Sequence, residues 1–239
     1  MAKAVRLDKF LADAGKGTRS EVKKFIQKGQ VQVNGVPAKK PELKVDPEKD
    51  TVVLSGETVG AAPEFVYYLL NKPAGCVSAT EDRNDRTVME YVPSDRKGLF
   101  PVGRLDKDTE GLLLITNDGE LGHKLLSPKK HVDKEYYVEC RDKLTEEAVK
   151  AFKSGMELKD GTVFAKAECT HIEDYSCHLV LHEGKYHEIK RMFLSVGNEV
   201  TYLKRIRMKN LILDETLKKG EYRLLTDEEL NDLKKDEQE

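Results

Sequence analysis

The chain has 239 residues, of which 38% are hydrophobic and 35% charged, and its net charge is −2. This length allows one large domain or two unequal ones, and the longest apolar runs are far too short to cross a bilayer. No stretch near the N-terminus has the pattern of a signal peptide, so we expect a cytoplasmic protein. The four Cys residues form no Cys-x-x-Cys pair and are too few for a disulfide scaffold, so we expect reduced thiols.

Charge is distributed unevenly along the chain. Residues 1–44 contain 11 Lys and Arg against 4 Asp and Glu, and residues 185–209 contain 7 against 2. Residues 226–239 are acidic, with 7 Asp and Glu against 2 Lys and Arg. Two basic segments in a nearly neutral chain favour contact with a polyanion such as nucleic acid, although solvated charged surfaces produce the same pattern.

The start of the chain has the pattern of a small independent module. Residues 5–14 are expected to form a helix, and Thr18 with Glu21 makes a capping box that predicts the start of a second helix. Residues 31–33 alternate like a strand, and Asn34-Gly35 is typical of a hairpin turn. We therefore expect two short helices followed by a small sheet.

Three stretches of this module resemble a known family. They are Arg6-Leu7-Asp8-Lys9-Phe10-Leu11, Thr18-Arg19-Ser20-Glu21 and Gly29-Gln30-Val31-Gln32-Val33-Asn34-Gly35. The module resembles the S4 RNA-binding domain, in which two short helices carry basic side chains to structured RNA. The resemblance implies these RNA-binding residues: Arg6, Arg19, Lys23, Lys24 and Lys28. The alternative is a small basic α+β cap with no role in RNA binding.

The rest of the chain is expected to form a second, larger domain. The module ends at residue 54, residues 55–63 have the small residues, Gly and Pro of a flexible linker, and residues 64–239 follow. Strands are expected over residues 65–70, 111–116, 136–141, 163–171 and 177–182, and helices over residues 118–126, 145–153 and 186–196. Because the strands cluster late with few helices between them, we expect an α+β fold with a mixed or antiparallel sheet. The acidic tail is expected to end in a frayed helix.

Two further patterns leave alternatives open. Residues 204–209 alternate like a strand with one basic face, which fits either an RNA-facing strand or an edge strand protected by charge. Metal-ligand residue types occur late in the chain at Cys169, His171, Cys177, His178 and His182. Alternation along two strands would scatter them over both faces, and no Gly-rich phosphate loop is present, so neither a metal nor a cofactor is expected.

A polar turn precedes the strand expected over residues 111–116. It contains Gly103-Arg104-Leu105-Asp106, so Asp106 lies on a loop held by a rigid apolar strand, a common position for a catalytic group. The pattern alone also fits an ordinary turn or capping Asp. It does not favour Asp106 over Asp108.

A second resemblance separates these two carboxylates. The seventeen residues from Gly103 to Gly119 are similar to the central motif of the bacterial RsuA/RluB family of ribosomal RNA pseudouridine synthases. Three other motifs of that family occur in the right order along the chain, the first before this segment and two after it: Asn71-Lys72-Pro73-Ala74-Gly75, Lys134-Glu135-Tyr136 and Glu183-Gly184-Lys185-Tyr186-His187-Glu188-Ile189-Lys190-Arg191-Met192-Phe193. The resemblance covers essentially the whole chain, and it implies that Asp106 is the nucleophile.

The reaction implied by this resemblance breaks the N1–C1′ bond of a uridine and rejoins the base through C5. The base must first leave its stack, at a cost of a few kcal/mol. By resemblance Lys190 is the cation that orients Asp106, and Tyr136 stacks on the extruded uracil and can help to move the C5 proton. Periodicity alone favours an interior strand residue for Tyr136. The residues do not distinguish attack on C1′ from a glycal route.

The resemblance also implies a set of substrate-binding residues: Arg104, Ile189, Arg191, Asn71 and Lys72. Arg104 either enters the gap left by the flipped base or makes a phosphate contact or surface ion pair. Ile189 is either an apolar wall of the pocket or a core residue. Glu188 departs from the family, which usually has Gln there, and its carboxylate would alter a local hydrogen bond or pair with Lys190.

Within the family, two stretches look most like the small-subunit enzyme. They are Ser127-Pro128-Lys129-Lys130-His131 followed by Lys134, and Tyr186-His187 followed by Lys190-Arg191-Met192-Phe193. They imply a uridine of 16S rRNA as the target, by resemblance uridine 516, with Lys129 and Lys130 binding RNA. The expected partner is ribosomal RNA within a small-subunit assembly intermediate, bound by a monomer with no membrane contact. The alternatives are a 23S rRNA synthase and a non-catalytic rRNA-binding assembly factor.

Overall fold

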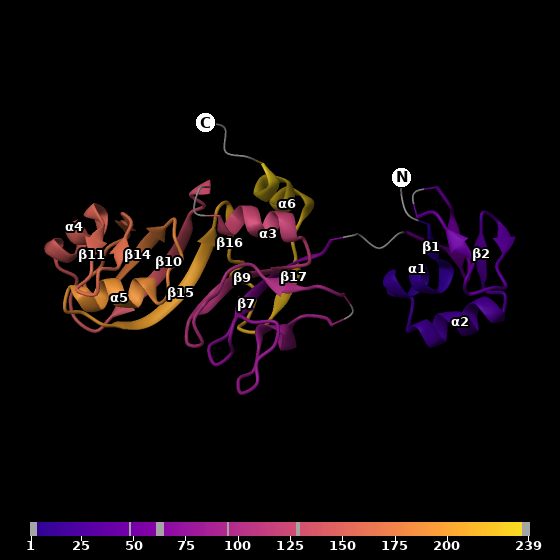
Figure 1. Cartoon of the computed structure of the whole chain (residues 1–239), viewed down its shortest axis with the longest axis horizontal. Coiled ribbons are helices and arrows are strands. Elements are labelled where there is room, and N and C mark those ends of the chain that lie inside the picture. The colour runs from indigo at the N-terminus through magenta and orange to yellow at the C-terminus, as the bar shows by residue number, and fades with distance from the viewer. Residues whose placement is uncertain (1–3, 48, 61–64, 95, 128–129, 236–239) are drawn as a thin grey trace. The chain divides into compact units, whose positions relative to one another are not determined.

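The computed structural model describes residues 4–47, 49–60, 65–94, 96–127 and 130–235. The chain divides into two compact units, Met1–Glu64 and Phe65–Glu239, and each combines helices with sheets (Figure 1). The fold is therefore α+β, as expected. Within the described ranges, no helix is long and apolar enough to cross a membrane.

The N-terminal unit packs two helices against a small sheet. Its elements are β1 (Val5–Arg6), α1 (Leu7–Asp13), α2 (Arg19–Gln27), β2 (Val31–Val33), β3 (Val36–Pro37), β4 (Lys44–Val45), β5 (Val52–Leu54) and β6 (Glu57–Val59). Four strands form an antiparallel sheet in the order β3-β2-β5-β6, and β1 pairs with β4. The predicted capping box is confirmed, because the Thr18 hydroxyl accepts from Glu21 N and the Glu21 carboxylate accepts from Thr18 N.

The expected linker over residues 55–63 is wrong in its first half. Ser55 and Gly56 have φ values of 52° and 91°, and they turn the chain between β5 and β6. Two residues with positive φ make a tight hairpin, so the small residues here are a turn. Val59 at the end of β6 is buried in the core of the unit. Residues 61–64 lie outside the described residues.

The C-terminal unit is built on one large sheet. Its first elements are β7 (Tyr67–Lys72), the 3-10 helix η1 (Val88–Tyr91), β8 (Phe100–Pro101), β9 (Glu110–Thr116), α3 (Gly119–Leu126), β10 (Lys134–Cys140), α4 (Glu146–Ser154), β11 (Met156–Glu157) and β12 (Val163–Phe164). They are followed by β13 (Glu168–Thr170), β14 (Ser176–Leu181), α5 (Glu188–Ser195), β15 (Val200–Met208), β16 (Leu211–Ile212), β17 (Tyr222–Leu224) and α6 (Asp227–Lys234). The single strand expected over residues 163–171 is two short strands, β12 and β13, which belong to different sheets.

The main sheet has the order β13-β14-β10-β15-β9-β7-β17, with β16 beside β15 and β8 beside β9. Among the described residues, β9 and β15 run parallel and the other neighbours run antiparallel, so the expected mixed sheet is confirmed. Every residue of β7 and β9 is buried, because hydrophobic cores cover both faces of that half of the sheet. β10 instead alternates between buried and more exposed residues, and its buried face packs in the core that contains Ile189 and Phe193 of α5.

The edge-strand interpretation of residues 204–209 is wrong, because β15 lies inside the sheet between β10 and β9. The RNA-facing interpretation stays a prediction, although three of the four basic side chains make contacts within the protein. Arg205 is buried, Arg207 pairs with Glu135 at 2.7 Å, and Lys209 donates to backbone carbonyls of residues 232–235. Gly111 makes the central position of β15 possible, because a Cβ there would lie 2.2 Å from the Arg205 carbonyl oxygen.

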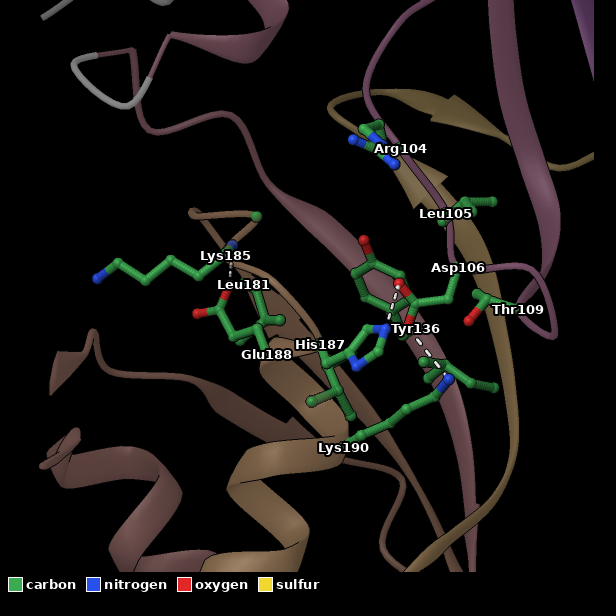
Figure 2. A pocket seen from close by; sticks show the side chains of 13 residues that line it. Arg104, Leu105, Asp106, Thr109, Tyr136, Leu181, Lys185, His187, Glu188 and Lys190 are labelled. Carbon is green, nitrogen blue, oxygen red and sulfur yellow. Dashed lines mark hydrogen bonds and ion pairs between the residues drawn. The ribbon is translucent and has the colours of Figure 1, made fainter. Parts of the chain in front are cut away.

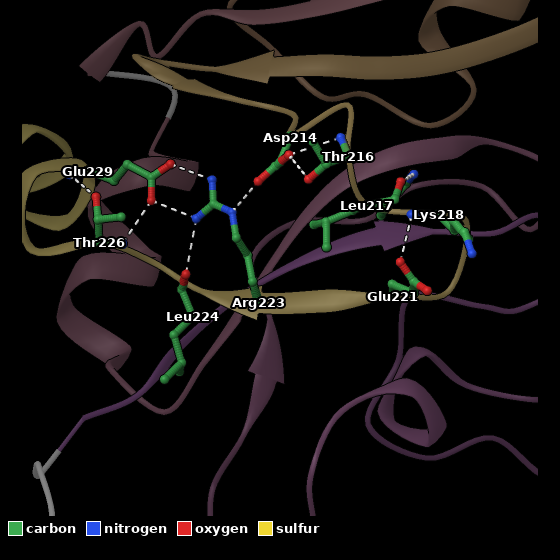
Figure 3. A network of polar contacts seen from close by, with 10 residues as sticks. Asp214, Thr216, Leu217, Lys218, Glu221, Arg223, Leu224, Thr226 and Glu229 are labelled. Atoms are coloured by element: carbon green, nitrogen blue, oxygen red, sulfur yellow. Dashed lines mark hydrogen bonds and ion pairs between the residues drawn. The ribbon is translucent and has the colours of Figure 1, made fainter.

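The C-terminal helix is anchored by the charged cluster in Figure 3. Arg223 of β17 pairs with Asp214 at 2.6 Å and with both carboxylate oxygens of Glu229 in α6, at 2.8 and 2.7 Å. Thr226 and Glu229 form a capping box at the start of α6. The helix expected in the acidic tail is therefore present and tied to the edge of the sheet. Residues 236–239 lie outside the described part of the chain.

Candidate active site

A buried lysine of β7 forms hydrogen bonds to the backbone of the loop that carries Asp106. Lys72 is completely buried, and its ammonium donates to the carbonyl oxygens of Pro73 at 3.1 Å, Asp106 at 3.1 Å and Thr109 at 2.8 Å. Burial lowers the pKa of Lys72, and nearby acidic groups oppose that shift. A buried cation needs such partners, so the loop and the lysine fix each other's position.

Two further contacts hold the same loop. The Ser78 hydroxyl accepts from Leu105 N at 3.0 Å and donates to the Leu105 carbonyl at 2.9 Å. The backbone N–H of Gly75 donates to the carbonyl of Lys107 at 2.7 Å. The segment after β7 therefore binds the residues on both sides of Asp106, and the carboxylate projects from a fixed backbone.

These contacts correct the roles expected for Asn71 and Lys72. Both were predicted to bind substrate, but neither lines the pocket next to Asp106. The Asn71 side chain donates to the carbonyl of Leu217 at 2.8 Å, in the loop before β17. β7 is buried on both faces, and the Asn71 amide nitrogen and the Lys72 ammonium both donate to backbone carbonyls, while Asn71 Oδ1 is buried with no hydrogen-bond partner among the described residues.

The Asp106 carboxylate lies between two nitrogen groups from the start of α5, as Figure 2 shows. The Lys190 ammonium is 3.1 Å from Asp106 Oδ2 and 2.6 Å from Asp108 Oδ1. His187 Nε2 is 3.6 Å from Asp106 Oδ1. Burial lowers the pKa of Lys190, but its hydrogen bonds to Asp108 and Asp106 outweigh that effect and raise the pKa above its ordinary value. Lys190 is therefore a stable cation beside the carboxylate.

Asp106 faces an open-sided pocket with about 420 Å³ of empty space, including the solvent at its mouth. Apolar side chains form much of its wall: Leu105, Leu181, Ile189 and Leu203. Ile189 is 4% exposed and belongs to the core as well, so both interpretations of this residue hold. Arg104 lines the pocket too, as expected for a substrate-binding residue. A few charged groups converging on an apolar concavity are typical of a small-ligand site.

Tyr136 of β10 lines the same pocket and is 8% exposed. It is therefore both an interior strand residue and a pocket residue. Burial raises its pKa, while Arg205, its neighbour across the β10–β15 pair, acts in the opposite direction. Arg205 Nε donates to the Leu112 carbonyl at 2.7 Å, and its Nη2 has no hydrogen-bond partner within the described ranges. The tyrosine thus remains a phenol with a buried cation beside it.

Glu188 does not pair with Lys190, contrary to one of the two expectations. Positions two apart on a helix point about 200° away from each other. Glu188 Oε2 accepts from the backbone N–H of Lys185 at 2.9 Å, and Oε1 is buried with no hydrogen-bond partner in the described part of the chain. Burial raises the pKa of Glu188. Burial also lowers the pKa of the neighbouring Lys134 to about 8, although Glu188 opposes that shift.

Comparisons with known proteins agree with this geometry. A family model described as RNA pseudouridylate synthase matches residues 66–195, and a model of the S4 domain matches residues 5–52. The chain belongs to the RNA pseudouridylate synthase family. Its N-terminal unit is accordingly an S4 domain, and the unit that contains Asp106 has the synthase fold.

Full-length relatives carry both parts. The synthase is 46% identical to an uncharacterized RNA pseudouridine synthase of Bacillus subtilis, over 95% of this chain and 97% of that protein. It is 38% identical to ribosomal small subunit pseudouridine synthase A of Haemophilus influenzae, over 97% and 100% of the two chains. A crystal structure of a pseudouridylate synthase matches with a TM-score of 0.68 and 36% identity, over 96% of this chain and 99% of that one.

Arg191 does not line the pocket of the synthase, although it was expected to bind substrate. Its guanidinium donates to Asp160 at 2.6 Å and to Thr162 at 2.9 Å, and it lies 5.3 Å from the centre of the Phe164 ring. One residue after Lys190, a helical side chain points about 100° away. The guanidinium therefore anchors the β11–β12 hairpin instead.

Two basic residues of the pocket, Lys185 and His187, are among the lining residues that were not assigned from the sequence. The available indication was their place inside the motif that also contains Lys190. Among the described residues, no group of three or more His, Cys, Asp or Glu side chains is placed to bind a metal ion. Lys130 is exposed, whereas Lys129 lies outside the described residues.

The cations expected to bind RNA in the S4 domain fall into two groups. Arg6, Arg19 and Lys23 surround the buried carboxylate of Asp8, at 3.0, 3.8 and 3.9 Å. These cations are each about half exposed, and Arg6 is the most closely held because it makes two hydrogen bonds to Asp8. Two other lysines of this unit, Lys24 in α2 and Lys28 at its C-cap, are exposed, and no carboxylate of the described residues lies within ion-pair distance of them.

Proposed function

We propose that the synthase converts a uridine of 16S ribosomal RNA to pseudouridine, with Asp106 as the nucleophile. The observation that carries this proposal is the position of the Asp106 carboxylate. It lines a pocket and lies between the Lys190 ammonium and the His187 ring. The target that we propose is uridine 516, within an assembly intermediate of the small subunit. The enzyme acts as a monomer in the cytoplasm, where ribosomes are assembled.

The residues around the pocket divide the reaction between them. The target base leaves its stack and enters the pocket beside Tyr136, whose ring offers a stacking surface that offsets part of the flipping cost. Lys190 holds the Asp106 carboxylate in position. When the carboxylate attacks C1′, the N1–C1′ bond breaks and its electron pair goes to N1, and the bond between Asp106 and C1′ breaks again when C5 attacks C1′. The apolar walls allow the freed uracil to turn until C5 faces C1′. The new C5–C1′ bond forms, the C5 proton leaves and N1 ends protonated, so the reaction is a net isomerisation.

The buried environment assigns Tyr136 a limited role in proton transfer. Its pKa is raised by burial, so the hydroxyl stays protonated at neutral pH. A protonated phenol stacks on the base and donates a hydrogen bond, but it is a weak base for the C5 proton. Asp106 occupies the same position whether it attacks C1′ or removes a proton on a glycal route.

The choice of 16S over 23S rRNA rests on the relatives, and the basic segments support rRNA binding in general. The Haemophilus influenzae relative is named for the ribosomal small subunit and aligns over its whole length. The S4 domain supplies exposed cations at Lys24 and Lys28 for the RNA backbone, and Lys129 and Lys130 are proposed as a further contact.

Tritium release provides a direct test. We would incubate the enzyme with 5-tritiated 16S and 23S rRNA from a strain that lacks its gene, because C5 loses its hydrogen only when the new bond forms. We expect release from 16S rRNA, with one new carbodiimide-dependent reverse-transcription stop at uridine 516. Release from 23S rRNA alone would support the alternative target. Failure to release tritium from either RNA would favour the non-catalytic assembly factor.

A further inference from the structure

An exposed aromatic pair lies at the edge of the active-site pocket. The rings of Tyr186 and His187 are stacked, with centroids 3.8 Å apart and planes 21° from parallel. Tyr186 is 75% exposed, so one face of its ring packs on His187 and the other faces solvent. His187 lines the pocket, and its Nε2 lies 3.6 Å from Asp106 Oδ1. The stack therefore extends from the proposed nucleophile to the protein surface.

The backbone of His187 has an uncommon conformation. It has φ 49° and ψ 35°, in the left-handed region, directly before α5. A non-glycine residue in that region is uncommon and is held there by the surrounding structure. Single exposed apolar residues are common on protein surfaces and by themselves indicate no ligand. His187 differs from such residues, because it stacks on the exposed ring of Tyr186 and also lies beside the proposed nucleophile, Asp106.

We propose that Tyr186 is a stacking platform for the nucleobase next to the extruded uridine. This inference rests on the proposed function, because it needs RNA strand at the mouth of the pocket. When a base flips out, its neighbour in the strand loses a stacking partner. An exposed aromatic face beside the pocket replaces that partner, and every nucleobase has a π-face that can use it.

The geometry connects this platform to the reacting groups. The face of the His187 ring packs on Tyr186 and its Nε2 lies near Asp106, so a base seated on the outer face of Tyr186 extends the stack by one layer. Arg104, which also lines the pocket, is available for the backbone phosphate of the same strand. Tyr186 thus binds the substrate strand without touching the reacting atoms.

The test compares two substitutions of an exposed residue. Tyr186→Leu removes the aromatic face but keeps an apolar side chain, and Tyr186→Phe keeps the ring. Removing a base–aromatic stack of ordinary strength weakens binding roughly 5- to 100-fold. Because the stack forms before and during the reaction, we expect KM for a 16S rRNA fragment to rise by that factor in Tyr186→Leu, with kcat nearly unchanged. Tyr186→Phe should behave like the wild type.

A binding measurement separates this proposal from the proposed reaction. An RNA fragment that carries 2-aminopurine on either side of the target uridine would be titrated with Asp106→Asn, which leaves Tyr186 in place. We expect its fluorescence to be quenched at one of the two positions, equally in the double variant with Tyr186→Phe and much less in the one with Tyr186→Leu. Equal quenching by Leu and Phe, or none at either position, would overturn the platform. An absence of tritium release by the wild type overturns the proposed function instead, whatever the fluorescence shows.

Discussion

The two units of the synthase use positive charge in opposite ways. In the catalytic unit, Lys72 and Arg205 are buried and donate to backbone carbonyls around the Asp106 loop and β9. In the S4 domain, Lys24 and Lys28 lie on an exposed helical surface. Buried cations fix the geometry of a site, whereas exposed ones contribute to an attractive field that each residue strengthens by a small amount.

This difference predicts how substitutions behave in each unit. Removing a buried cation leaves its backbone acceptors without a partner, so a single change has a large effect. Exposed charges are screened by salt and are individually weak, so several must be removed before binding changes much. The same residue type, lysine, should therefore be sensitive at position 72 and tolerant at position 28.

The largest expected effect comes from the proposed nucleophile. Asp106→Asn keeps the shape of the side chain but removes the carboxylate that we propose attacks the sugar or accepts a proton. We expect turnover to fall on the order of 10³-fold or more, with folding and RNA binding retained. Asp108→Asn is the matched control, because Asp108 is also bonded to Lys190, at 2.6 Å, but is largely exposed. Tritium release would measure both, and a loss in Asp108→Asn as large as that in Asp106→Asn would contradict the assignment.

The next largest effect is expected from Lys72→Met. It leaves the carbonyl of Thr109 without its donor in a buried site, whereas the carbonyls of Asp106 and Pro73 keep hydrogen bonds from Thr109 N and Cys76 Sγ. At roughly 1–3 kcal/mol for an unsatisfied buried group, the free energy of unfolding should fall by about 1–3 kcal/mol. Activity should fall as well, because the Asp106 loop loses its support.

Lys107→Met is the control for the same loop. Lys107 forms an exposed ion pair with Asp85 at 2.6 Å, a contact worth less than about 1 kcal/mol. Urea denaturation followed by circular dichroism would give both values. If Lys72→Met and Lys107→Met lose equal stability, then burial of a lysine does not determine how much it contributes to the free energy of unfolding.

Local patterns were enough to predict most elements of the fold. The capping box at Thr18 and the period of β10 depend on neighbouring residues only, and both are present as expected. The position of β15 inside the sheet could not be predicted in this way. It depends on a parallel pairing with β9 that requires Gly111, a contact between residues about 90 positions apart.

The site shows the same limit. The motif resemblance gave Asp106, Tyr136 and Lys190, which the fold brings to one pocket, although their chemical roles stay predictions. It did not distinguish residues that line the pocket from residues that support it. Lys72 and Arg191 also belong to motifs of this family. Lys72, however, is buried under the loop that carries Asp106, and Arg191 on α5 points away from the pocket. Side-chain direction depends on the packing of each element, which a motif does not contain.

A smaller, pH-dependent effect is expected at Glu188. Burial raises the pKa of Glu188 in the folded protein above its ordinary value of 4.5. The folded state therefore binds this proton more tightly than the unfolded state does. The stability that this gives is fully present below pH 4.5 and is lost as pH rises through the folded pKa. Glu188→Gln does not titrate, so the wild type should lose stability relative to this variant as the pH rises from 4.5 through the folded pKa.

Urea denaturation of both proteins across that range would measure the difference. Glu146→Gln, which neutralises an exposed carboxylate at the start of α4, controls for the change in net charge. A wild-type advantage that grows as pH rises would mean that Glu188 is stabilised as a carboxylate, for example by Lys134. That result would mean that the Glu188 carboxylate is a paired charge and not a buried charge without a partner.

The smallest effect for each residue is expected on the S4 surface. Lys24→Gln with Lys28→Gln removes two exposed cations that have no close carboxylate among the described residues. Each cation that neutralises a phosphate contributes about 0.7 to 0.9 to the slope of log affinity against log salt concentration. The double variant should therefore flatten that slope by about 1.4 to 1.8, with little change in stability. Lys150→Gln with Lys153→Gln on α4 removes the same charge from the catalytic unit and should leave the slope nearly unchanged. If both double variants flatten the slope equally, RNA responds to net charge alone, and the S4 surface has no special part in binding it.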